Sequence, residues 1–251
     1  MSLFNLRQTM IRNTVRRTTG MKFTTGASMK QGQGAEGETR PVVYELRTYS
    51  LHPNKLREYL DLTSKEFHLR TAHSKLVGFW TSEIGGLNQA VHIWEYGSLS
   101  ERAGVRARLA GDPEWVGRYF GRILPMLQCQ ENALLTLLPG TQLSLPLNKG
   151  VYELQTMQMQ GAPGLWSKTL SQWVQACERA RQNAGTQAVG VWGSILGHRQ
   201  TAIVLWQHPD PDGCLALADA ASSLPEGDTL APLVIGSHSK LLLPHAVSPL
   251  Q

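Results

Sequence analysis

Four side chains with useful chemistry alternate on two segments that favour β-strands. Glu45 and Arg47 lie two residues apart in the first segment, and His92 and Trp94 in the second. Successive strand residues point to opposite faces, so each pair shares one face of its strand. If both faces line a barrel cavity, an acid, a cation, an imidazole and an aromatic wall converge, which suits a small polar and aromatic ligand. The alternative is a buried structural ion pair beside core aromatics.

Other signatures of catalysis or metal binding are missing from the sequence. It contains no Gly-x-Ser-x-Gly, no phosphate-binding loop ending in Lys-Ser/Thr and no His-Glu-x-x-His. His68 and His73 are five residues apart, which does not suit one helical face, so they predict a polar helix end. Cys129, Cys177 and Cys214 are too few and too scattered for a disulfide framework or a closed zinc site. We therefore expect no catalytic residues, no metal and no cofactor.

Two copies of one module of about 100 residues make up most of the chain. Segment 43–48 recurs as 151–156, and segment 77–80 recurs as 189–192, in the same order. The acid and the tryptophan of the candidate site recur and so favour a structural role, whereas the cation and the imidazole are confined to the first copy. The second-copy counterparts are Glu153, Gln155, Val204 and Trp206. The predicted domains are a tail at 1–41, a first module at 42–145 and a second, partly degraded module at 146–251.

Each module follows the order strand, helix, strand, strand, helix, strand. In the first copy we expect strands at 42–49, 76–84, 89–96 and 130–138, and helices at 53–71, at 100–110 and from Asp112-Pro113 onward. In the second copy the last helix is shortened to 214–221 and is followed by a loop at 222–228. This order is ferredoxin-like, and such a sheet has helices on one face only. The predicted fold class is therefore α+β, with tandem ferredoxin-like modules forming a dimeric α+β barrel, and pairing between chains stays open.

Composition and charge separate the tail from the body. The chain of 251 residues is 41% hydrophobic and 17% charged, which is typical of a folded protein. The sequence contains no run of about 18 uncharged apolar residues, so it predicts no transmembrane helix. Residues 1–41 hold seven Lys and Arg against two Glu, which accounts for the whole net charge of +5. The remainder is neutral overall and offers no general attraction for nucleic acid or anionic lipid.

The tail has the composition of a mitochondrial transit peptide. It is rich in Arg, Ser and Thr, and no acid precedes Glu36. On a helical wheel its apolar and basic residues fall on opposite sides, the former being Leu3, Leu6 and Met10 and the latter Arg12 and Arg16. A flexible linker then follows. A basic extension without a targeting role is the alternative.

Four segments of the first copy together resemble the NIPSNAP family, specifically its third branch. They are Tyr44–Tyr49, His68–His73, Leu76–Trp80 and His92–Tyr96. The resemblance extends over about residues 42–251 and implies a dimeric α+β barrel associated with mitochondria. It also implies links to vesicle traffic, and recruitment of autophagy receptors and ubiquitin-like autophagy proteins at damaged mitochondria. It supplies no catalytic residues.

The expected function is a non-enzymatic, mitochondria-associated adaptor in mitochondrial quality control that recruits mitophagy receptors. The expected partners are those autophagy proteins and the mitochondrial import machinery, and the expected location is the mitochondrial matrix or surface. One alternative is a small-ligand or haem-binding barrel protein or enzyme, and another is a cytosolic vesicle-trafficking scaffold. Two aromatic-x-x-aliphatic segments, 59–62 and 192–195, match short autophagy motifs but lie in predicted regular structure, where they are poor candidates.

Overall fold

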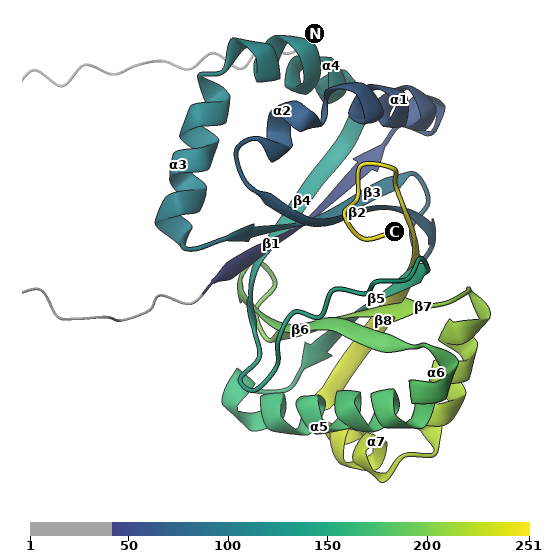
Figure 1. The fold of residues 1–251 in the computed structure, drawn as a ribbon. Helices are drawn as coiled ribbons and strands as arrows, with labels where there is room; N and C mark the ends of the chain where they lie inside the picture. The colour runs from purple at the N-terminus through teal and green to yellow at the C-terminus, as the bar shows by residue number, and fades with distance from the viewer. Residues whose placement is uncertain (1–41) are drawn as a thin grey trace, which may run out of the picture. The chain divides into compact units, whose positions relative to one another are not determined.

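Eight antiparallel strands close into one barrel in a computed structural model that describes residues 42–251 (Figure 1). The tail predicted at 1–41 lies outside the described residues. The strands are β1 (Val43–Leu51), β2 (Lys75–Ile84), β3 (Gln89–Tyr96), β4 (Leu127–Leu137), β5 (Val151–Met159), β6 (Gln187–Leu196), β7 (Thr201–His208) and β8 (Val234–Pro244). Their order around the barrel is β1-β3-β2-β8-β5-β7-β6-β4. The α+β barrel expected from the sequence is confirmed.

The two halves of the chain contribute matching sets of strands to this barrel. The first half runs β4-β1-β3-β2 and the second runs β8-β5-β7-β6. The pairings of β2 with β8 and of β4 with β6 join the sets, so the barrel closes within one chain. Closure leaves no sheet edge exposed and buries the face that each four-stranded sheet would otherwise leave bare.

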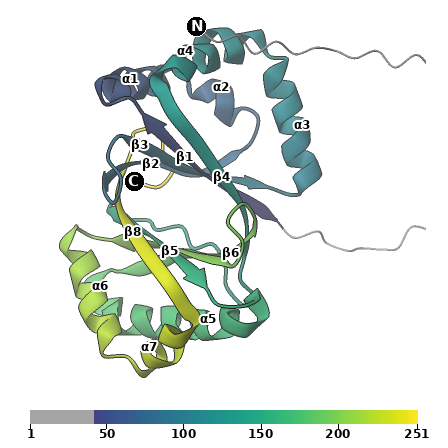
Figure 2. The ribbon, with the colours of Figure 1, turned by 180° about the vertical axis from the view of Figure 1, so that it is seen from behind.

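Helices cover the outside of the barrel on two opposite sides (Figures 1 and 2). The α-helices are α1 (Leu56–Glu66), α2 (His68–Thr71), α3 (Leu99–Ala110), α4 (Gly121–Ile123), α5 (Pro163–Arg181), α6 (Asp212–Ser222) and α7 (Pro225–Leu230). A π-helical turn occupies Trp115–Phe120, and 3₁₀ turns occupy Pro53–Lys55, Leu124–Met126, Gln182–Ala184 and Ala231–Leu233. None of the described helices is long and apolar enough to cross a membrane.

The helix predictions hold with two corrections. The helix expected at 53–71 is divided into a 3₁₀ turn, α1 and α2. The loop expected at 222–228 was wrong, because α7 begins at Pro225. Proline suits the first helical turn, and the acids Glu226 and Asp228 next to it favour a helix N-terminus. Leu230 then buries against the rest of the second-half core, which stabilises this short helix.

The barrel interior is packed with aromatic and aliphatic side chains from both halves. Tyr44 contacts Trp192 with ring centroids 5.8 Å apart, and Tyr152 contacts Trp80 at 5.4 Å. The repeated tyrosine of each half thus meets the repeated tryptophan of the other. The repeated glycine two residues before each tryptophan has a physical role, since a Cβ on Gly78 would lie 2.1 Å from the indole of Trp80. These conserved spacings between the copies therefore serve packing inside the barrel.

Candidate functional site

The four residues singled out by the sequence lie together on the outer face of the first-half sheet. In the pairing of β1 with β3, Glu45 lies opposite Trp94 and Arg47 lies opposite His92. The helices of the first half cover this face, so the residues are beneath helices and not inside the barrel. The reason is the two-residue period of a strand, which turns their neighbours, such as Ile93, into the barrel interior.

Glu45 is fully buried, and its carboxylate oxygens already accept hydrogen bonds from neighbouring side chains. It accepts hydrogen bonds from Arg102 and Asn132, each at 2.6 Å, and from the Tyr96 hydroxyl at 3.3 Å. Burial alone would raise the pKa of Glu45, but the hydrogen bond from Arg102, the charge of Arg47 and the hydrogen bond from Asn132 outweigh it and lower the pKa. The carboxylate is therefore an ionised member of a buried network.

His92 presents an N–H group that has no partner among the described residues. The indole Nε1 of Trp94 donates to Nδ1 of His92 at 2.6 Å. Because an indole nitrogen only donates, Nδ1 accepts, and the neutral ring carries its proton on Nε2. Burial, followed by the charges of Arg47 and Arg70, holds the pKa of His92 well below its usual value. The ring stacks on Phe79 at 5.4 Å, so a neutral imidazole is fixed with its Nε2 unpaired.

Arg70 is a member of the site that the sequence analysis did not select. Its guanidinium carbon lies 3.8 Å from the centre of the Trp94 ring, as in a cation–π contact. It also donates to the Tyr96 hydroxyl at 2.8 Å and to Ser74. Burial lowers the pKa of Arg70, although Tyr96 opposes that shift. Arg70 lies between His68 and His73, in a segment whose sequence predicts only a polar helix end.

A cavity of about 370 Å³ lies between this face and the helices. Three cations, Arg47, Arg70 and Arg106, line it together with His92, and none of the described residues lining it is an acid. The remaining walls are mainly apolar and aromatic, including Phe67, Trp94, Trp115, Tyr119 and Phe120. Trp115, Tyr119 and Phe120 lie in the π-helical turn, a feature often found at functional sites. The cavity is thus positively charged and has flat walls.

Larger hollows exist on the described residues, but we do not select them as the candidate ligand site. One of about 610 Å³ opens at an end of the barrel, and one of about 500 Å³ lies on the second half. The polar and charged lining of the barrel-end hollow includes Thr48, Glu131, His238 and Lys240. Charges of both signs face this hollow, so it has no clear preference for an anion. We therefore take the smaller cavity beneath the helices as the candidate ligand site.

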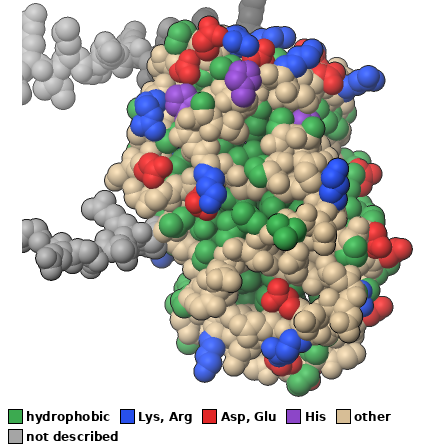
Figure 3. Space-filling view, in the orientation of Figure 1, with side chains coloured by type: hydrophobic (Ala, Val, Ile, Leu, Met, Phe, Trp, Pro, Cys, Tyr) green, Lys and Arg blue, Asp and Glu red, His purple; other side chains and the backbone are tan. Residues whose placement is uncertain are grey.

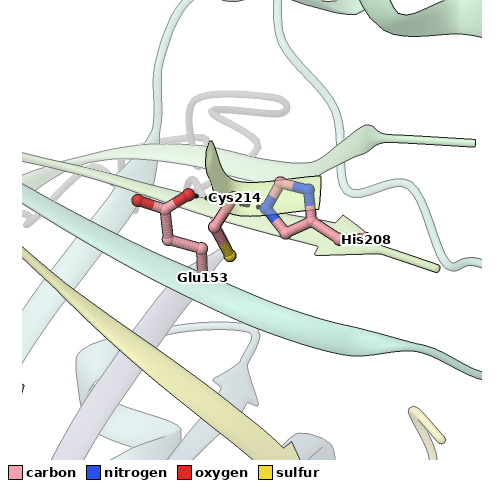
Figure 4. Close-up of side chains that lie close together, drawn as sticks. All are labelled: Glu153, His208 and Cys214. Atoms are coloured by element: carbon pink, nitrogen blue, oxygen red, sulfur yellow. Dashed lines mark ion pairs between the residues drawn. The ribbon is translucent and has the colours of Figure 1, made fainter. Parts of the chain in front are cut away.

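A second cluster of polar side chains lies in the second half, where Glu153, His208 and Cys214 face one another (Figure 4). Their ligand atoms all lie within 4.8 Å of one another, and Nε2 of His208 is 3.4 Å from Oε2 of Glu153. Burial, followed by the charge of Glu153, raises the pKa of the Cys214 thiol to about 11. The sequence analysis missed this cluster because Glu153, in β5, lies far along the chain from His208 and Cys214.

The fold and the cavity define an α+β barrel protein with a cationic, aromatic site under the helices of its first half. The sequence model of the NIPSNAP family matches residues 44–142. NipSnap homolog 3A of Homo sapiens is 35% identical to this chain, and the match covers 84% of this chain and 86% of that protein. NipSnap homolog 3B of Mus musculus is 38% identical, over 67% and 68% of the two chains. The chain belongs to the NIPSNAP family.

A solved structure extends the comparison of folds. A protein of Fusobacterium nucleatum that is provisionally named a monooxygenase matches 84% of this chain and 98% of its own, with a TM-score of 0.59. Only 9% of the residues are identical, so this similarity shows the fold alone. Because α+β barrels carry many unrelated functions, the function has to be argued from the site.

Proposed function

We propose that this NIPSNAP-family chain is a non-enzymatic binding protein whose first-half cavity takes a small, planar anion. The observation that carries the proposal is the lining of the cavity, in which Arg47, Arg70 and Arg106 face the same space without an acid among the described lining residues. Guanidinium groups pair well with planar carboxylates, and the aromatic walls suit a flat ring. His92 also lines the cavity, and its buried Nε2–H has no partner among the described residues.

The groups around the cavity support binding more than turnover. A general base needs a free acceptor within reach of the substrate. Nδ1 of His92 is engaged by Trp94, and the nearby carboxylate of Glu45 is held by Arg102 and Asn132. A base would therefore have to break an existing buried hydrogen bond before it could act. The alternative is a redox enzyme or a haem-binding protein, and the experiment below includes measurements that test for it.

The test is binding of 2-naphthoate, with 2-naphthylmethanol as the neutral analogue of the same shape. We expect the acid to quench tryptophan fluorescence and the alcohol to bind at least about 10-fold more weakly, the effect of roughly one charge-assisted hydrogen bond. Arg47→Met should weaken binding of the acid by a similar factor, whereas Arg57→Met, at an exposed position, should not. Equal binding of acid and alcohol would refute the anion site. Absorbance with added haem or flavin and a turnover assay test the alternative.

A second role, recruitment of proteins at mitochondria, is favoured by family membership and by the composition of residues 1–41. In this proposal the import machinery reads the tail, and the barrel acts in mitochondrial quality control by recruiting autophagy receptors and ubiquitin-like autophagy proteins. Apolar side chains are exposed across the middle of one face (Figure 3). On the connection between β4 and β5, Leu145 is 53% exposed and Leu147 is 100% exposed, which supports a protein-binding surface. The two aromatic-x-x-aliphatic segments are poor candidates, because Tyr59 and Trp192 are fully buried.

The mitochondrial proposal is tested by intact mass after separation of mitochondria from cytosol. A protease-protected mitochondrial species that lacks roughly 20–40 N-terminal residues is the expected result. A full-length cytosolic species would instead favour the vesicle-trafficking scaffold. Recovery of autophagy receptors with the wild-type chain, and loss of that recovery on Leu147→Asp, would support the adaptor role.

The fold proposal also has a finer part. The matching strand order of the two halves supports an origin from one ferredoxin-like module, duplicated in the chain. Pairing of two such barrels as a homodimer is a further part of the proposal. Sedimentation analysis over a range of concentrations tests it, and a monomer at all concentrations would refute the dimer.

A further inference from the structure

The two halves of the barrel handle the same buried acid in different ways. Glu45 and Glu153 occupy corresponding places, since β1 pairs Val43 with Tyr96 and β5 pairs Val151 with His208. In the first half, Arg102 from α3 meets the Glu45 carboxylate at 2.6 Å. In the second half, the first turn of the matching helix α6 brings a cysteine to the carboxylate instead.

Glu153 therefore lacks the permanent cation that its counterpart has. Among the described residues, its ion-pair partner is the imidazole of His208, which is charged only when protonated. A buried carboxylate without a fixed cation is unfavourable. A bound metal ion is one of the ways in which proteins meet this requirement.

The donor atoms are arranged so that each ligand keeps one atom free for a shared cation. Nδ1 of His208 lies 3.2 Å from the Thr186 hydroxyl, while its Nε2 is fully buried, faces Glu153 and has no hydrogen-bond partner among the described residues. Oε1 of Glu153 accepts from Gln155 at 3.1 Å, which leaves Oε2 toward the histidine. Metal-bound histidines usually have such an oxygen on the second ring nitrogen, where it fixes the ring orientation.

We propose that Glu153, His208 and Cys214 bind one Zn²⁺ ion, with a fourth position open to water or to a further ligand. One carboxylate oxygen, one imidazole nitrogen and one thiolate match the donors that Zn²⁺ prefers. Bond lengths of about 2.0–2.3 Å place tetrahedral ligand atoms roughly 3.5 Å apart. Nε2 of His208 and Oε2 of Glu153, 3.4 Å apart, already have this spacing. No two of the three ligand atoms are more than 4.8 Å apart, so a bound ion would draw Cys214 closer by at most about 1.3 Å. Cys214 is partly exposed, so its side leaves the open position.

The experiment uses the whole chain, stripped of metal with a chelator and titrated with Co²⁺. One equivalent of Co²⁺ should give visible d–d bands of a low-symmetry site and a near-ultraviolet thiolate charge-transfer band, and Zn²⁺ should displace it. Cys214→Ser should abolish the charge-transfer band and weaken Zn²⁺ binding at least about 100-fold. Cys129→Ser and Cys177→Ser are the matched controls, and both should retain the band.

Two results would overturn the site: no saturable binding of Co²⁺, or a charge-transfer band that survives Cys214→Ser. A second measurement on the unaltered chain avoids any folding defect of the variant. Zn²⁺ should slow alkylation of Cys214 by iodoacetamide, read by peptide mass, while alkylation of the exposed Cys129 keeps its rate. Equal rates at Cys214 with and without Zn²⁺ would leave His208 and Glu153 as a simple ion pair.

Discussion

Replacing Arg102 with methionine removes the closest cation from a fully buried carboxylate. The Arg102 side chain is 19% exposed and the Glu45 side chain 1%, and their closest N–O distance is 2.6 Å. Methionine keeps most of the aliphatic length, so the change mainly removes charge and hydrogen bonding. The variant leaves Glu45 with Asn132 at 2.6 Å, with the Tyr96 hydroxyl at 3.3 Å and with Arg47 at 4.0 Å.

The expected loss of stability at pH 7 is about 3 kcal/mol. Removing one member of a buried ion pair costs about 3–5 kcal/mol, and the lower end applies because three other partners of Glu45 remain. For a domain of this size, that loss corresponds to a fall in Tm of roughly 6–12 °C. Urea unfolding followed by tryptophan fluorescence measures it, with the slope of the transition checked for two-state behaviour.

The stability difference between Arg102→Met and the parent should depend on pH. The folded-state pKa of Glu45 is lowered, so its ionised form stabilises the fold above its unfolded pKa, and this contribution is lost as pH falls through the folded pKa. Without Arg102, burial dominates and the pKa of Glu45 rises. The variant should therefore take up a proton at higher pH, and its deficit relative to the parent should shrink between pH 7 and pH 4.

Two further variants decide whether the reasoning is right. Adding Glu45→Gln to Arg102→Met removes the stranded charge and should recover part of the lost stability. Arg118→Met is the matched control, because Arg118 forms ion pairs of 2.7 and 2.8 Å with Glu66 and Glu114 at the surface. Its unfolding curve should nearly overlay that of the parent. A loss below about 1 kcal/mol for Arg102→Met, or no recovery in the double variant, would refute the account.

Three other outcomes are expected. Gly78→Ala should lower the free energy of unfolding by about 3 kcal/mol or more, since the new Cβ would overlap the indole ring of Trp80. Gly117→Ala, at a helical position with open space, should be neutral or stabilising by about 0.5–1 kcal/mol. Thermal unfolding compares the two variants, and equal effects would contradict the packing argument. The lowered pKa of His92 keeps its imidazole neutral in the folded protein. As the pH falls below the unfolded pKa near 6.5, the free energy of unfolding should therefore drop by about 1.4 kcal/mol per pH unit on account of this residue. His92→Gln should flatten the dependence of stability on pH between about 6.5 and 5, and an unchanged slope would count against a neutral imidazole. Leu250→Ala should lose about 2–4 kcal/mol, because this buried side chain belongs to the apolar cluster of the barrel interior. Leu147→Ala, at a fully exposed position, should not alter the unfolding midpoint in urea, and the reverse order of the two variants would contradict the described packing.

The candidate site was only partly predictable. Alternation on the strands placed Glu45 with Arg47 and His92 with Trp94 on common faces, and the register of β1 with β3 joins the two pairs. Arg70 was not predictable from the same pattern, because its approach to Trp94 depends on how α2 packs over the sheet. Whether this face lines the barrel interior stays open in the sequence. Alternation tells which residues share a face but not which face turns toward the helices.

The proposed metal-ligand cluster was even less predictable from the local sequence. Glu153 was identified as the repeat of Glu45, and Cys214 was counted as an isolated thiol. Their meeting with His208 depends on the strand register and on the place where α6 begins, neither of which is written in local sequence. Long-range contacts of this kind follow from the whole topology.

The sequence by itself determined the recurring segments, the predicted order of strands and helices and the charge of the tail, because these depend on local periodicity and composition. Repeated segments such as 43–48 and 151–156 predict a two-module organisation without any structure. Only the tertiary structure decided that the barrel closes within one chain, that the cationic cavity lies beneath helices, and that an arginine of one half is replaced by a cysteine in the other. Each of these depends on which surfaces bury against each other, and burial is a property of the assembled fold.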